Sequence, residues 1–191
     1  MSTLFSRGSR KTSPIPAGTW VADPAHSTVG FSVKHLGIAT VRGSFDTFAG
    51  TLTVGQALAD GRIDGTIEAG SVNTQEPQRD DHLRSADFFD VANHPEITFV
   101  AETLRQGDDE EFEIAGSLTM HGVTRAVALN ALVQGIETDP WGQERVGLEI
   151  TGQLSRGDYA MKFNQVLGSG NLLISDKVKI RLDVSLVRQG D

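Results

Sequence analysis

Apolar and polar residues alternate along most of this chain. The clearest case is 178–186, where valine, isoleucine and leucine occupy every second position between Lys179, Arg181 and Asp183. The same two-residue period recurs at 29–35, 43–45, 52–54, 63–69, 97–101, 112–120, 127–133 and 146–154. Such alternation is typical of antiparallel strands that have one face in water and one in a core.

These segments predict an all-β fold of about eight antiparallel strands, which closes into a barrel or packs as two sheets because open strand edges pair with other chains. An eight-stranded barrel is wide enough either to fill with side chains or to hold one small ligand. Several predicted inward positions are small: Gly65, Ala69, Ala101, Gly116, Ala131 and Gly152. Small residues favour an apolar cavity, whereas glycines at bulges and bends are compatible with a filled core. The pattern leaves both interpretations open.

One stretch, 79–99, interrupts the two-residue period and reads RDDHLRSADFFDVANHPEITF. We predict a short helix over 79–86, because two acidic residues suit its first turn and the residue before the proline at 94–95 must be extended. Phe88 and Phe89 follow this helix directly and can pack it against the barrel. The stretch is therefore either a flap at the barrel mouth or a connection that only closes off the core.

Composition is that of one ordinary globular domain, with 191 residues and 38% hydrophobic side chains. We place the domain at 18–189 and predict a disordered basic tail at 1–17, which holds Arg7, Arg10 and Lys11 and no acid. Because no apolar segment follows these charges, we expect no secretory signal and a cytoplasmic protein.

Charge and residue types exclude several function classes. A net charge of -8 argues against a nucleic-acid partner. With no run of about 18 apolar residues, we expect no stable membrane insertion. The absence of cysteine excludes disulfides, thiol nucleophiles and thiolate metal sites.

The histidines offer little catalytic chemistry. They are His26, His35, His82, His94 and His121, and none has the spacing of a zinc protease. His35 is in phase with an apolar face, as a core histidine or as a polar contact at a cavity mouth. A metal bound by His82 with Asp81 or Asp87 would need further ligands, and Ser27 lacks the G-x-S-x-G motif of a hydrolase nucleophile. We therefore predict no catalytic residue and no metal site.

Five stretches occur in a characteristic order: DPAHSTVGFSVKH at 23–35, DDHLRSADFFD at 80–90, HPEITF at 94–99, GSLTMHGVTR at 116–125 and SRGDY at 155–159. Together they resemble the YceI family of lipocalin-like proteins, which bind polyisoprenoids and related lipids. The resemblance implies an eight-stranded antiparallel lipocalin-like barrel with one helix beside it and a long apolar chain held inside. Several members of that family pair as homodimers.

The chain departs from the family pattern in two places. Many members carry a secretory leader, whereas this chain begins with a polar basic segment. The usual Phe-Gly after Arg-x-Asp is replaced here by Tyr159-Ala160, which implies a difference in that loop.

The leading hypothesis is a non-enzymatic carrier or sequestering protein for a long-chain isoprenoid, such as a quinone tail or a polyprenyl phosphate. It needs no cofactor, since each buried methylene contributes roughly 0.8 kcal/mol. Phe88 and Phe89 are expected to hold the flap and His35 to contact the head group. The full set expected to contact the ligand is Phe31, Val33, His35, Phe45, Ile67, Phe88, Phe89, Phe99, Leu118, Met120, Leu129, Leu148, Ile150 and Leu182.

Two alternatives stay open. One is a hydrolase acting on a lipid or small ester, which would use His35 or His121 with a nearby acid but lacks a recognisable nucleophile. The other is a barrel with a filled interior that serves as a protein-binding module.

Overall fold

Eleven strands and one α-helix make up the part of the chain that the computed structural model describes, residues 13–108 and 110–190. The strands are β1 (Gly18–Ala22), β2 (Thr28–His35), β3 (Ala39–Phe45), β4 (Phe48–Val54), β5 (Arg62–Glu68), β6 (Val72–Asn73), β7 (Glu96–Gln106), β8 (Glu111–Met120), β9 (Val123–Thr138), β10 (Glu144–Ser155) and β11 (Ile174–Arg188). The helix is α1 (Pro77–Arg84), and four short 3₁₀ turns lie between strands.

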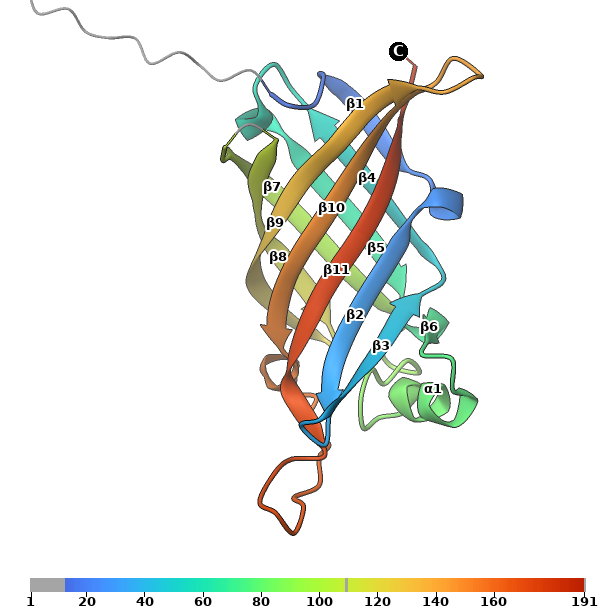
Figure 1. Cartoon of the computed structure of the whole chain (residues 1–191), viewed down its shortest axis with the longest axis vertical. Helices are drawn as coiled ribbons and strands as arrows, with labels where there is room; N and C mark the ends of the chain where they lie inside the picture. The colour runs from blue at the N-terminus through green and yellow to red at the C-terminus, as the bar shows by residue number, and fades with distance from the viewer. Residues whose placement is uncertain (1–12, 109, 191) are drawn as a thin grey trace, which may run out of the picture.

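Eight of these strands close into a ring in the order β1-β4-β5-β7-β8-β9-β10-β11, with β11 pairing back onto β1 (Figure 1). The long strand β11 pairs with β1 through its C-terminal residues, 186–188, and with β2 through the earlier residues 174–183. The β2–β3 hairpin therefore extends the barrel wall below β1 and β4. All of these pairings are antiparallel. The prediction of an eight-stranded antiparallel barrel with one helix is confirmed.

A tight turn sets the register of β8 and β9. His121 and Gly122, between β8 and β9, have φ values of 52° and 71°, and Met120 pairs with Val123 across them. A two-residue loop with both φ values positive matches the right-handed twist of a hairpin. This His-Gly pair therefore forms the hairpin turn that joins β8 to β9.

Helix α1 starts at Pro77 and ends at Arg84, two residues earlier at each end than the predicted 79–86. Proline is well suited to the first helical position because its missing N–H has no intrahelical acceptor there. The Glu76 side chain caps this end by accepting a 3.2 Å hydrogen bond from the Gln78 amide. At the other end, the Ser85 hydroxyl donates to the His82 carbonyl, and irregular turns lead on to β7.

The barrel is sealed at the end where the ordered N-terminal segment enters. Ile15 and Trp20 are both 0% exposed and belong to one apolar cluster, and the Trp20 indole N–H donates to the Pro16 carbonyl at 3.1 Å. Ile15, which the sequence pattern assigned to the tail at 1–17, is therefore part of this apolar cluster. Residues 1–12 lie outside the described residues.

Candidate ligand-binding cavity

The barrel encloses a cavity of about 650 Å³ whose lining is almost entirely apolar. This volume lies within the roughly 300–1,000 Å³ that small-molecule sites occupy. The alternative of a barrel filled by its own side chains is therefore wrong.

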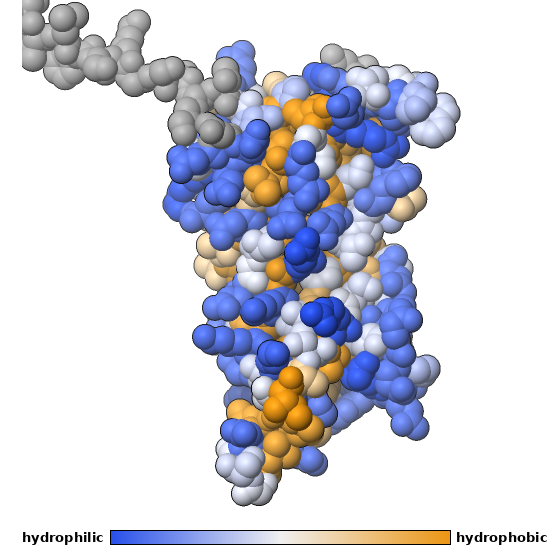
Figure 2. Space-filling view, viewed as in Figure 1, coloured by the Kyte–Doolittle hydropathy of each residue, from blue (hydrophilic) through white to orange (hydrophobic). Residues whose placement is uncertain are grey.

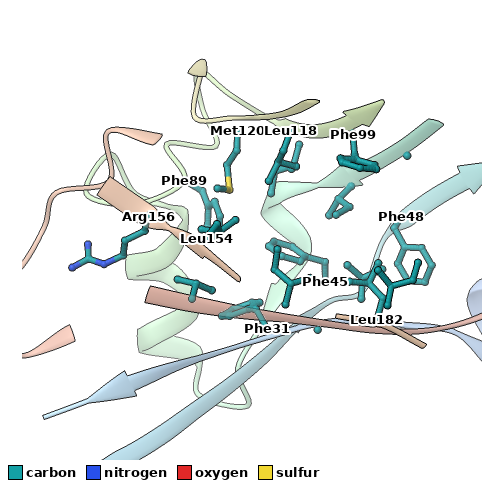
Figure 3. A pocket seen from close by; sticks show the side chains of 18 of the residues that line it. Phe31, Phe45, Phe48, Phe89, Phe99, Leu118, Met120, Leu154, Arg156 and Leu182 are labelled. Carbon is teal, nitrogen blue, oxygen red and sulfur yellow. The ribbon is translucent and has the colours of Figure 1, made fainter. Parts of the chain in front are cut away.

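Every residue expected to contact a ligand lines this cavity: Phe31, Val33, His35, Phe45, Ile67, Phe88, Phe89, Phe99, Leu118, Met120, Leu129, Leu148, Ile150 and Leu182. Figure 3 shows several of these side chains converging from opposite walls. For the members on strands, this position follows from alternation, because one face of each strand must point inward in a closed barrel; Phe88 and Phe89 lie in the turns after α1. Their role in binding stays a prediction.

Glycines opposite large side chains help to keep the interior open. Gly43 pairs directly with Phe31, and a Cβ at Gly43 would lie 2.4 Å from the Phe31 ring. A Cβ at Gly116 would likewise lie 2.6 Å from the Phe99 ring. Each ring thus rests against bare backbone of the neighbouring strand instead of projecting into the lumen.

The cavity is blind at the sealed end. Phe112, Leu104 and Val146 are at most 2% exposed there, in the same cluster as Trp20. Along β11, Leu186 belongs to this cluster and lines the inner limit of the cavity, which continues past Leu182 and Val178 towards the opposite end. A ligand must therefore enter from the end that carries α1.

The two phenylalanines after α1 hold the helix over this mouth from two sides. The Phe89 ring packs edge-on against Phe45 of β3 at 5.5 Å. The Phe88 ring, 6% exposed, contacts Phe163 at 5.4 Å and His82 at 5.0 Å. The helix and its following turns thus have the position expected of a flap.

The charged run of α1 anchors the flap, a role that the sequence did not reveal. Buried Asp80 accepts hydrogen bonds from the Thr74 amide at 2.8 Å and from the Thr74 hydroxyl at 2.6 Å. Arg79 donates to the same hydroxyl at 2.7 Å, and Arg84 donates to the Gly70 carbonyl at 2.8 Å. These bonds join the helix to the chain segment that precedes it.

Most ionisable lining residues gather at the flap end of the cavity: Lys34, His35, Glu76, Arg79, His82 and Arg156. The His35 side chain makes no hydrogen bond to another described residue, so its ring nitrogens are available to a ligand. It is positioned by the end of β2, where it pairs with Ile174 of β11.

Arg156, which the sequence analysis did not select, braces the loop beside the mouth. It is 6% exposed and donates to the carbonyls of Met161 at 2.8 Å, Ser175 at 3.1 Å and Ile174 at 3.4 Å. Burial lowers the pKa of Arg156. Its guanidinium points away from the other labelled side chains (Figure 3), which makes it a structural brace.

The two histidines named in the hydrolase alternative lie in different surroundings. His121 donates through Nδ1 to the Tyr159 carbonyl at 2.8 Å and packs on the His94 ring. Neither His35 nor His121 is hydrogen-bonded to a hydroxyl nucleophile among the described residues. Over the same residues, no group of three or more side chains is arranged to hold a metal ion.

The loop that departs from the family pattern keeps a conformation suited to glycine. Ala160 has φ 59°, in the left-handed region. Tyr159 is 1% exposed, its hydroxyl has no hydrogen-bond partner among the described atoms, and burial raises its pKa.

Residues 20–186 match the sequence model of the YceI-like domain. The chain belongs to the YceI family. Protein YceI of Escherichia coli O157:H7 is 36% identical over 162 residues, which cover 84% of this chain and 83% of that protein.

Solved structures share the YceI fold. BcnA of Burkholderia cenocepacia superposes with a TM-score of 0.75 at 20% identity, over 88% of this chain and 99% of its own. A polyisoprenoid binding domain from Saccharophagus degradans, implicated in plant cell wall breakdown, gives a TM-score of 0.69 at 19% identity over 91% and 100% of the two chains.

No described helix is long and apolar enough to span a bilayer.

Proposed function

We propose that this protein binds a long-chain isoprenoid or similar lipid inside its barrel and carries or sequesters it without chemical change. The observation that carries this proposal is the apolar cavity of about 650 Å³, closed at one end and open beside α1. Membership of the YceI family supports it, as does a structural neighbour named as a polyisoprenoid binding domain.

The cavity suits a molecule with an apolar tail and a polar head. Burying each methylene contributes roughly 0.8 kcal/mol, so the lumen can bind a hydrocarbon tail with few polar contacts. The tail would point to the sealed end near Trp20 and the head group would lie at the mouth. His35 is the side chain we assign to the head group, because it lines the mouth and is unpaired among the described residues.

Filling the cavity tests the proposal. Ile180 lines the lumen, whereas its neighbour Lys179 points outward and is exposed. We expect Ile180→Trp to lose most co-purified lipid, because the larger ring occupies the volume of the tail, and Lys179→Trp to retain it. Native mass spectrometry without detergent, followed by lipid extraction, measures bound mass, and the same spectrum reports whether the chain pairs as a homodimer, as several members of the family do.

The outcome depends on the comparison of the two variants with the unmodified protein. Circular dichroism first establishes that both variants fold. Absence of bound lipid from the unmodified protein, even after incubation with polyprenyl phosphate or quinone, contradicts the proposal. Equal lipid content in the two folded variants contradicts the assignment of the cavity as the site.

A further inference from the structure

Two loops that project beyond the cavity mouth expose apolar side chains. Ile38, in the β2–β3 turn, is 82% exposed, and Val166 and Leu172, between the 3₁₀ turn η4 (Arg156–Tyr159) and β11, are 74% and 45% exposed. We call residues 36–38 and 164–173 the tip loops. They form the lower end of the molecule, where apolar surface gathers (Figures 1 and 2).

Hydrogen bonds hold the tip loops in a defined shape. The Leu36 amide donates to the Leu173 carbonyl at 2.9 Å and joins the two loops. Val166 and Leu172 are antiparallel bridge partners, so their side chains lie next to each other. The exposed apolar residues therefore form part of an ordered structure that presents them together.

Charge at this end opposes that of the whole protein. The chain carries a net charge of -8, yet residues 31–45 and 159–175 contain Lys34, Arg42 and Lys162 and no Asp or Glu. All three basic side chains are exposed. The acidic residues of α1 are set back from the tip along the long axis (Figure 1).

We propose that the tip loops dock reversibly on an anionic lipid bilayer. Exposed apolar side chains rimmed by basic residues are the combination that binds the interface of anionic membranes. Docking there would point the cavity mouth at the bilayer, from which a lipid could pass under α1. This surface goes beyond the proposed lipid binding and does not require it, since the tip can bind a membrane whether or not the cavity is loaded.

Vesicle co-sedimentation tests the docking surface. The double variant Ile38→Asp/Val166→Asp removes apolar contact and adds negative charge at the tip. Trp141→Asp is the matched control, because Trp141 is 83% exposed in the β9–β10 turn at the opposite end. The vesicles are phosphatidylcholine with about 30% phosphatidylglycerol, and pure phosphatidylcholine serves for comparison.

We expect the unmodified protein and Trp141→Asp to bind the anionic vesicles alike, and the tip variant to bind at least about tenfold more weakly. Added salt should weaken binding, because it screens the basic residues. Absence of binding by the unmodified protein, or equal binding by the tip variant, overturns the proposal.

Two further measurements identify other outcomes. Light scattering after size exclusion reports subunit number. If the tip variant changes from dimer to monomer while its vesicle binding is unchanged, the tip is a self-association surface, and the membrane-docking proposal is overturned. Lipid content of each variant reports the cavity separately. Bound lipid with no vesicle binding contradicts the docking proposal alone, whereas vesicle binding with an empty cavity contradicts the proposed function alone.

Discussion

Single glycines decide whether neighbouring chains can approach closely in this barrel. Gly122 combines a left-handed φ of 71° with a close neighbour, since a Cβ there would lie 2.7 Å from Cε1 of His94. The turn between β8 and β9 therefore fixes both the hairpin and the segment that leads from the flap into β7.

We expect Gly122→Ala to lower the free energy of unfolding by about 2 kcal/mol, because alanine is strained at positive φ and would displace His94. Urea denaturation measures the change. Gly168 is the control, since its φ is ordinary and a Cβ there meets nothing within 4 Å. Equal effects of Gly122→Ala and Gly168→Ala would contradict the strain argument.

At the scale of elements, an ion-pair cluster ties the sealed end together. Arg145 of β10 donates to Asp23, just before the first 3₁₀ turn, and to Asp139 in the β9–β10 turn, each at 2.8 Å. The hydrogen bond from Arg145, followed by that from His26, holds the pKa of Asp23 at about 2 instead of 3.8, and the bond from Arg145 also lowers the pKa of Asp139. The cluster thus connects three parts of the chain through one guanidinium.

These lowered pKa values predict acid sensitivity. From about pH 5 upward both aspartates are ionised in the folded and unfolded states, and their stabilisation is fully present. As the pH falls from about 5 through 3.8 towards 2, the unfolded chain takes up protons first, so stability is lost. We expect Arg145→Met to flatten this part of the curve of unfolding free energy against pH.

The control for this prediction is Arg105→Met. Arg105 forms an exposed ion pair with Glu113 at 2.7 Å, and exposed pairs of this kind contribute little to stability. Chemical denaturation at a series of pH values measures both variants. A slope in Arg145→Met as steep as in the unmodified protein would show that the cluster does not cause the acid sensitivity.

At the scale of the whole molecule, a hollow barrel couples its stability to its ligand. A lipid that binds only the folded state raises stability by about 2.7 kcal/mol at a hundredfold excess over Kd. For a chain of this length, removal of the lipid should therefore lower Tm by roughly 5–10 °C. Differential scanning calorimetry before and after delipidation measures the shift, and Ile180→Trp should show almost none. A Tm that does not respond to lipid in the unmodified protein would contradict the proposed function.

Local pattern predicted more of the cavity than of its surroundings. Alternation identified the lining residues of β2, β7 and β11, such as Phe31, Phe99 and Leu182, because it fixes which side chains share a face. Arg156 and Phe163 were missed, since their roles depend on contacts with segments far along the chain. Ile15 was assigned to a tail because nothing in the nearby sequence shows that it meets Trp20.

The sequence by itself determined antiparallel strands with one apolar face, because the two-residue period of a strand is a local property of the chain, and the resemblance to the YceI family implied that they close into a barrel. Only the tertiary structure decided that the interior is hollow, sealed near Trp20 and open beside α1. The reason is that both features depend on how large side chains from distant strands meet. In the middle of the barrel aromatic rings lie against glycines, whereas near Trp20 the large side chains pack against one another.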